Sequence, residues 1–211
     1  SVTVDSENRW WLTYGSWSST GASGGGVHLV ELNSTTGLLG SAALAGCADS
    51  FPFCWSPNNT AFTNIANNPR HGDKYDDTNS LEASYLYRRH KHDFFLFVNY
   101  YWCCRGLNST YEIRVGRSRS PKGPFLDRAG VDMRSGGGSL LVRNATRTAR
   151  HALVGPGHAG VLHDPHSGAY AFTFDFQGVD NSTGTQYQTQ ARELTWDAAG
   201  WPVVGEANFV P

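Results

Sequence analysis

The chain has 211 residues, of which 39% are hydrophobic and 17% charged, and its formal net charge at pH 7 is −1. This length is enough for one or two domains with a sizeable core. A near-neutral chain without a polybasic surface, and without an apolar run near the roughly 18 residues of a membrane span, is expected to have neither nucleic acid nor membrane as a partner.

Short segments rich in Val, Tyr, Phe, Trp and Thr, separated by clusters of Gly, Asn, Asp and Ser, predict an all-β chain. The segments group into three similar units at about residues 1–45, 80–142 and 150–211. Each unit has an aromatic strand, such as "RWWLTYGSW", "DFFLFVNYYW" or "GAYAFTFDFQ", and a further strand after a loop. Repeated multi-stranded units indicate blades of a β-propeller in one domain over residues 1–211, with a β-sandwich as the alternative.

Between the first two units, residues 46–80 have no regular pattern and predict a long irregular loop. It contains Cys47 and Cys54, whose spacing is compatible with a small disulfide loop. A loop of this length is seldom without a function. The second unit contains the longest basic run, residues 88–92, which we interpret as a solvated turn between two strands.

Two features indicate a secreted, glycosylated protein. Cysteines are even in number, and Cys103 and Cys104 are adjacent, so they form either a strained bridge or remain free. N-x-[ST] sequons begin at five asparagines. The sequence has no initiator Met or signal peptide, so we expect it to be processed or to begin within a longer gene. Glycans are expected at Asn33, Asn58, Asn144 and Asn181, whereas the fifth sequon, at Asn108, lies inside the motif described next.

The second unit contains "LEASYLYRR" and then "FFLFVNYYWCCRGLNSTYEIRVGRSRSPKGPF", and this combination resembles the arabinanases of glycoside hydrolase family 43. "RWWLTYGSW" upstream, and "GGGSLL", "GPGHAGVL" and "LTWDAAGWPVV" downstream, are similar to the family in the same order. The resemblance covers most of the chain, though not residues 46–80.

The resemblance implies a five-bladed β-propeller with its substrate cleft on the axis, of which this chain would carry only the C-terminal three blades. It also implies inverting hydrolysis, in which one carboxylic acid protonates the leaving oxygen and a second carboxylate activates water. A third acidic residue tunes the acid.

Carried over residue by residue, the resemblance places Glu82 at the general acid. His158, in "GPGH", falls on an axial histidine that in many of these enzymes helps to hold calcium or another ion through water. The other matches fall on the edges of the cleft and are expected to bind substrate: Tyr14, Gly15, Ser16, Arg105, Gly106, Ser109 and Thr110.

The family's base aspartate lies in the first blade, and its tuning aspartate lies in an I-D-P motif just before the third-blade strand. This sequence starts at Ser1 immediately after the place of that motif, so we expect both aspartates and two blades to be missing. The base would then come from elsewhere: from a companion N-terminal chain, or from the spare acids Asp49, Asp73, Asp76 and Asp77 at a dimer interface.

The sequence therefore favours a glycosidase that acts on a plant-type arabinan polysaccharide or oligosaccharide. The alternative is a catalytically inactive, lectin-like homodimer, in which two three-bladed halves cover each other's open sheets.

Three residues have structural alternatives. Glu82 alone could be an edge-strand carboxylate, and His158 alone could be a core histidine. Asp164, in "HDP", could mimic a base aspartate, but Asp-Pro-x-x-Gly is ordinary turn chemistry, and we interpret it as a turn.

Overall fold

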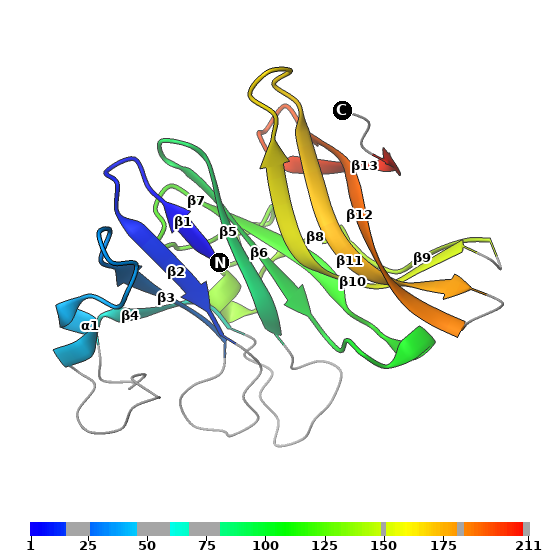
Figure 1. The fold of residues 1–211 in the computed structure, drawn as a ribbon, viewed down its shortest axis with the longest axis horizontal. Helices are drawn as coiled ribbons and strands as arrows, with labels where there is room; N and C mark the ends of the chain where they lie inside the picture. Colours follow the sequence, from blue (N-terminus) through cyan, green and yellow to red (C-terminus); the bar gives the residue numbers. More distant parts are fainter. Residues whose placement is uncertain (16–25, 46–59, 68–80, 149–150, 181–183, 209–211) are drawn as a thin grey trace.

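The computed structural model describes residues 1–15, 26–45, 60–67, 81–148, 151–180 and 184–208. These residues form three antiparallel sheets of four, four and five strands, which lie side by side in chain order (Figure 1). Each sheet is built from consecutive segments of the chain. The all-β prediction is therefore confirmed.

The first sheet has the order β1-β2-β3-β4, with β1 Val2–Val4, β2 Trp10–Tyr14, β3 Val27–Leu32 and β4 Phe62–Ala66. Because side chains alternate along a strand, β2 has two different faces. Trp11 packs into the core shared with the second sheet, whereas Trp10, Leu12 and Tyr14 pack on the opposite face, near the short helix α1, Ser41–Ala45.

The second sheet has the order β5-β6-β7-β8, with β5 Leu81–His90, β6 Asp93–Tyr100, β7 Glu112–Ser118 and β8 Ser139–Val142. Strand β6 is buried along its whole length. Phe94 and Leu96 belong to the core shared with the first sheet, and Phe95 and Phe97 to the core shared with the third sheet. Both faces of β6 are therefore covered, which explains why its sequence is a continuous apolar run.

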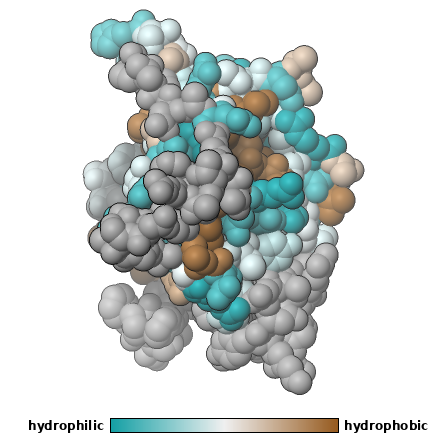
Figure 2. Space-filling view, turned by 90° about the vertical axis from the view of Figure 1, so that its right-hand side faces the viewer, coloured by the Kyte–Doolittle hydropathy of each residue, from teal (hydrophilic) through white to brown (hydrophobic). Residues whose placement is uncertain are grey.

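The third sheet has the order β13-β12-β11-β10-β9, with β9 Ala145–Thr148, β10 His151–His163, β11 Tyr170–Asp180, β12 Gly184–Trp196 and β13 Pro202–Asn208. Phe172, Phe174 and Leu194 pack against the second sheet. Leu162 and Val203, in contrast, are 61% and 41% exposed. Figure 2, viewed from the side of the third sheet, shows brown apolar surface scattered among teal polar surface.

Besides α1, the described residues form two 3-10 turns, η1 at Gly106–Asn108 and η2 at Met133–Ser135. No helix among the described residues is long and apolar enough to cross a membrane.

Two boundaries differ from those predicted. Residues 46–80 are not irregular throughout, because β4 lies within them and pairs with β3. The third sheet also starts before residue 150, because β9 pairs with β10. Both strands have at most five residues, too few for a pattern to be recognised without their partners. The three sheets also replace the two-sheet sandwich that was the alternative prediction.

Candidate active site

Glu82 lies at the start of β5, where the pairing with β6 is irregular. It pairs with Asn99, but the register shifts before Tyr85, and Ala83 has a positive φ of 51°. A bulge of this kind re-aims side chains and is frequent next to active sites. The local backbone thus sets the direction of the Glu82 carboxylate, which is half-buried.

Tyr111, just before β7, fixes one oxygen of that carboxylate. Its hydroxyl donates a hydrogen bond to Oε1 of Glu82 at 2.6 Å, and the residue is 1% exposed. Burial, together with the hydrogen bond and charge of Glu82, raises the pKa of the Tyr111 phenol. The phenol therefore stays protonated and remains a donor throughout the neutral range.

Strand β10 of the third sheet holds Tyr111 from the other side. A Cβ added at Gly157 would lie 2.6 Å from Cε1 of the Tyr111 ring, so only glycine fits there. The pairing of β10 with β11 shifts register on both sides of Gly157. This is the "GPGH" motif, and its glycine is needed for close packing next to the candidate acid.

Asn99, which is completely buried, ties the same stretch of β10 to β6. Its Nδ2 donates to the carbonyl oxygen of Pro156 at 2.9 Å, and its Oδ1 accepts from the backbone N–H of His158 at 3.1 Å. His158 has a positive φ of 56° and an exposed side chain. The core-histidine alternative is therefore wrong.

Calcium takes six to eight ligands, almost all oxygens. Among the described residues, no group of three or more His, Cys, Asp or Glu side chains could hold a metal ion. The described side chains near His158 therefore do not form a calcium site by themselves, and calcium stays a prediction.

Ser109 connects the motif after Cys104 to the third sheet. It is 2% exposed, its Oγ donates to Oε1 of Gln177 at 3.3 Å, and the same Oγ accepts from the backbone N–H of Arg105 at 3.0 Å. Gln177 in turn donates to the hydroxyl of Tyr187 at 2.9 Å, and Tyr187 is 70% exposed. Ser109 is thus a buried support for this edge of the site.

The neighbouring residues present polar groups at the surface. Arg105 is exposed, and its guanidinium lies 3.9 Å from the centroid of the Trp102 ring. Gly106 has a positive φ of 57° at the start of η1, and Thr110 is exposed and accepts a hydrogen bond from the Trp102 backbone. Together with Glu82 and Tyr111, these residues come from the second sheet at the end where β5 begins.

Cys103 and Cys104 form a disulfide with each other in this turn, with a Cα–Cα distance of 3.8 Å. The structure thus decides between the two possibilities left by the sequence, in favour of the bridge. The predicted pair Cys47 and Cys54 lies outside the described residues.

The first sheet contributes Tyr14 and Gly15. The Tyr14 ring packs with His28 and Phe62, on the face of that sheet opposite the second sheet. Its buried hydroxyl has no hydrogen-bond partner in the described part of the chain, and burial raises its pKa to about 12. Gly15 has a φ of 144°, and a Cβ there would collide with the carbonyl of Gly26. No described contact joins Tyr14 to Glu82, so its role in the cleft stays a prediction.

Seven further predicted residues fall outside the described ranges: Ser16, Asn58, Asn181 and the spare acids Asp49, Asp73, Asp76 and Asp77. Asn33 is exposed, and its Oδ1 accepts from the backbone of Thr35 and Thr36. Asn144 is also exposed, and its amide donates to the Ser109 carbonyl at 2.8 Å.

Asp164 lies in the hairpin turn between β10 and β11, where it accepts hydrogen bonds from Ser167 and the backbone of His166. These hydrogen bonds lower the pKa of its carboxyl, the Ser167 hydroxyl most of all. The turn interpretation of Asp164 is confirmed.

Sequence reasoning did not single out Tyr111, Asn99 or Gln177. Their hydrogen bonds to Glu82, His158 and Ser109 span 29 to 68 positions of the chain, so no local pattern reveals these contacts. The available signal for Tyr111 was its place in "NSTYEI", inside the motif that carries the resemblance.

The chain is similar to known enzymes that are named for arabinan or arabinofuranoside. The extracellular exo-α-(1→5)-L-arabinofuranosidase of Cellvibrio japonicus is 34% identical over 129 residues, which are 61% of this chain and 34% of the relative. The extracellular endo-α-(1→5)-L-arabinanase 1 of Bacillus subtilis is 27% identical over 201 residues, 95% of this chain and 48% of the relative. The chain thus spans about a third to a half of these relatives.

The solved structure of Cellvibrio cellulosa α-L-arabinanase complexed with arabinohexaose matches with a TM-score of 0.73 and 26% identity, over 97% of this chain and 56% of that one. An exo-1,5-α-L-arabinanase from a bovine ruminal metagenomic library matches with a TM-score of 0.70, also at 26% identity, over 97% of this chain and 55% of that one. The model of the family described as "Glycosyl hydrolases family 43" matches residues 1–202. The chain therefore belongs to glycosyl hydrolase family 43.

Proposed function

We propose that this chain carries the general acid and one side of the substrate cleft of an arabinan-cleaving glycoside hydrolase, with Glu82 as the acid. The observation that carries the proposal is the Glu82 carboxylate, aimed by a bulge in β5 and held at 2.6 Å by the buried Tyr111 hydroxyl. The relatives described above are named for α-1,5-linked arabinan or arabinofuranoside, which supports this substrate class.

In the proposed mechanism, Glu82 donates its proton to the glycosidic oxygen as the bond to C1 breaks. Tyr111 donates a hydrogen bond to Oε1, so the transferable proton is proposed to sit on Oε2. Positioning of this kind matters because proton transfer requires the acid within hydrogen-bond reach of the leaving oxygen.

Inverting hydrolysis also requires a base carboxylate about 6.5–9.5 Å from the acid, with room for a water between them. Asp164 and Asp5 are engaged in turns, and the resemblance assigns no residue of this sequence to the base. We propose that a carboxylate on another polypeptide segment supplies it.

The three sheets support the further proposal of a partial, three-bladed propeller of the five-bladed family type, as one domain over residues 1–211. A companion N-terminal chain or a second copy of this chain would cover the open faces of the first and third sheets. The share of the solved arabinanase that is matched, 56%, agrees with about three of five blades.

Substrate would contact the exposed Arg105 and Thr110 and the half-buried Gly106, with Ser109 as their support. Tyr14, Gly15 and Ser16 are proposed for the opposite edge of the cleft. A calcium ion near the exposed His158 would be held mostly by oxygens, with His158 helping to hold it through water.

We also propose that the protein is secreted and glycosylated. Both curated relatives described above are named as extracellular. Of the proposed glycan sites, Asn33 and Asn144 are exposed, and the Cys103–Cys104 disulfide fits an oxidising compartment.

The test is mass-spectrometric detection of shortened chains from linear 1,5-arabinan after incubation with the purified chain or with Glu82→Gln, each with and without sodium azide. Reducing-sugar release is not the readout, because a glycosyl azide product has no reducing end. Azide can attack C1 in place of base-activated water, forming a C–N bond while Glu82 protonates the leaving oxygen. Cleavage with azide only, lost in Glu82→Gln, supports a working acid and an external base. Cleavage without azide that is lost in Glu82→Gln also supports the acid and places a base within reach.

Arabinan binding without cleavage under either condition would contradict the enzyme proposal and support the lectin-like alternative. Equal cleavage by the wild type and Glu82→Gln would contradict the role of Glu82.

A further inference from the structure

A second site lies at the opposite end of the second sheet from Glu82. The strand pairing runs from Glu82–Asn99 at one end to Arg88–Phe94–Ser118 at the other. Six residues of extended strand span about 20 Å. A ligand at this far end would therefore not touch the candidate acid.

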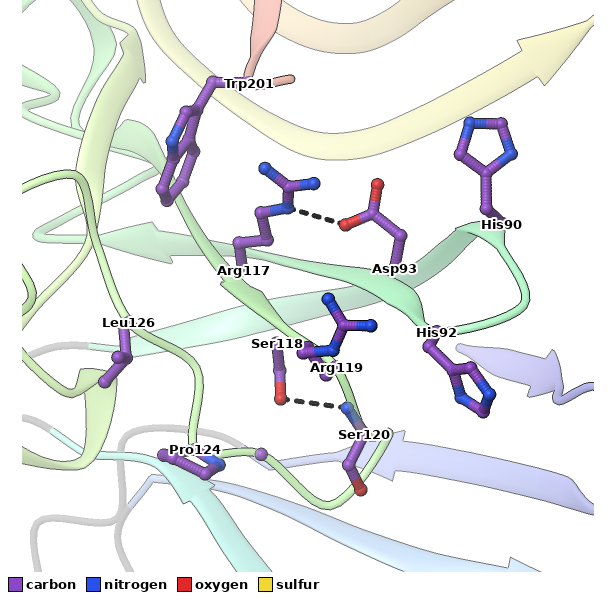
Figure 3. A pocket seen from close by; sticks show the side chains of 11 residues that line it. His90, His92, Asp93, Arg117, Ser118, Arg119, Ser120, Pro124, Leu126 and Trp201 are labelled. Carbon is purple, nitrogen blue, oxygen red and sulfur yellow. Dashed lines mark hydrogen bonds and ion pairs between the residues drawn. The ribbon is translucent and has the colours of Figure 1, made fainter. Parts of the chain in front are cut away.

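The far end contains a cavity of about 910 Å³, formed where the β5–β6 turn, the end of β7 and Trp201 meet. Its lining side chains include two arginines, two histidines and two serines (Figure 3). The volume is far larger than an inorganic anion needs and falls in the range of pockets that hold small organic ligands.

The cavity is rich in hydrogen-bond donors. Arg117 is committed to the protein, since its Nε donates to Asp93 at 2.6 Å and its Nη1 to the carbonyl of Ala199 at 2.8 Å. Arg119, in contrast, is exposed and makes no ion pair or side-chain hydrogen bond with any described residue. One arginine is thus compensated by Asp93 and the other is not, which leaves a positive charge in the cavity.

The two serines that line the cavity are further hydrogen-bond donors. Ser118, 7% exposed, accepts the backbone N–H of Ser120, and Ser120 accepts the backbone N–H of Lys122. Each hydroxyl has one proton to donate, and no acceptor for it is found among the described residues. The Asp93 carboxylate is already engaged by Arg117, so the unpaired charge of Arg119 makes the cavity favour an anion over a neutral or cationic group.

The remaining lining gives the cavity apolar surface. Trp201 is half-buried; the guanidinium of Arg128 lies 5.1 Å from its ring centroid, and the ring of Phe95 meets it in a T-shaped contact at 6.3 Å. Leu126 and Pro124 line another side. A rigid aromatic side chain beside a charged group suits a ring that carries a carboxylate, rather than a small symmetric anion.

We propose that this cavity binds a uronate unit of an acidic polysaccharide, with Arg119, Ser118 and Ser120 holding its carboxylate and Trp201 facing the sugar ring. One consequence rests on the proposed function: if the cavity anchors the protein on an acidic polysaccharide, the cleft at Glu82 can still take a neutral arabinan chain. The binding itself does not depend on catalysis.

The test is calorimetric titration of the full chain with oligogalacturonate, with its methyl ester, and with inorganic phosphate. Arg119→Gln should weaken oligogalacturonate binding about 10-fold or more, because a charge-assisted hydrogen bond is lost. Ser120→Ala should weaken it by a smaller factor. Arg143→Gln removes an equally exposed arginine that lies outside the cavity and should have no effect.

The methyl ester keeps the ring but not the charge and should bind at least 10-fold more weakly. Glu82→Gln should bind oligogalacturonate as the wild type does, even if it has lost cleavage, so failure of the two proposals can be told apart. The proposal is overturned by no binding, by equal losses in Arg119→Gln and Arg143→Gln, or by equal binding of the methyl ester. Phosphate binding as tight as that of oligogalacturonate would instead indicate a small-anion site and overturn the sugar assignment.

Discussion

The hydroxyl of Tyr111 lies 2.6 Å from Oε1 of Glu82, and Tyr111 itself is 1% exposed. The ring is held between the second and third sheets by contact with Gly157, so its hydroxyl has little freedom to leave the carboxylate. Glu82 is thus oriented by a residue 29 positions away that is itself positioned by a different sheet.

Tyr111→Phe removes only this hydroxyl. Because the phenol does not contact substrate in the proposed mechanism, we expect kcat on arabino-oligosaccharides to fall about 10- to 100-fold with little change in KM. Activity is measured under whichever condition, with or without azide, supports turnover by the wild type.

Tyr85→Phe is the matched control. Its hydroxyl also bridges the second and third sheets, donating to the carbonyl of Val161 at 3.3 Å, but it does not touch Glu82. Equal losses in the two variants would show that Tyr111 acts through general stability alone.

Gly157→Ala tests the close approach of β10 to Tyr111. The added methyl group would lie 2.6 Å from Cε1 of Tyr111, inside any normal contact, so the ring or the strand has to shift. We expect the free energy of unfolding to fall by about 1–3 kcal/mol, with a loss of cleavage that resembles Tyr111→Phe. Urea denaturation gives the first quantity. Gly40→Ala, where the nearest heavy atom to a Cβ is 3.9 Å away, should leave both unchanged.

Asp5 gives a prediction for acid stability. Burial by itself would raise the pKa of its carboxyl, but hydrogen bonds from the Trp11 indole, the Arg9 and Glu7 backbones and the Arg9 guanidinium outweigh burial and lower it from 3.8 to about 2. Because the folded pKa is the lower one, this stabilisation is fully present above pH 3.8 and is lost as the pH falls through about 2. It is worth about 2 kcal/mol.

Asp5→Asn should therefore be less stable than the wild type by about this amount at pH 7, and the difference should shrink below pH 3.8. Urea denaturation of both proteins at pH 7, 5, 3.5 and 2.5 measures it. A difference that stays constant across this series would contradict the assigned hydrogen bonds.

The pairing of Cys103 with Cys104 is checked by peptide mass spectrometry. Without reductant, the peptide that contains both cysteines should resist alkylation and be lighter by two hydrogen atoms than the dithiol. After reduction it should take up two alkyl groups. Alkylation of the unreduced peptide would mean that the thiols are free.

A strand could be predicted from the sequence where its hydrophobic pattern alone is enough to identify it. Strand β6 has a continuous apolar run because both its faces are covered, and β2 begins with three consecutive apolar residues because each of its faces also meets a core. Strand β4 could not be predicted, since its five residues become a strand only by pairing with β3.

The candidate site shows the same division. Glu82 could be proposed as the acid because it lies in a contiguous motif, whereas Tyr111 and Asn99 make contacts over long chain separations that no local pattern encodes. The basic run was predicted as a solvated turn, and this holds only for Lys91 and His92, because residues 88–90 end β5 and Arg89 packs over the Trp196 ring. His90 and His92 of this run also line a cavity together with residues 117–120. This could not be predicted, because it depends on the register of β6 with β7.

The most direct test of the central claim compares the loss caused by Glu82→Gln on two substrates, linear arabino-oligosaccharide and 2,4-dinitrophenyl α-L-arabinofuranoside, under the condition that supports wild-type turnover. The dinitrophenolate leaves without a proton, so it needs no general acid. If Glu82 is the acid, cleavage of the oligosaccharide should fall by about 100-fold or more while the aryl substrate is nearly unaffected. Equal losses on both substrates would contradict the assignment and leave Glu82 a structural or binding residue.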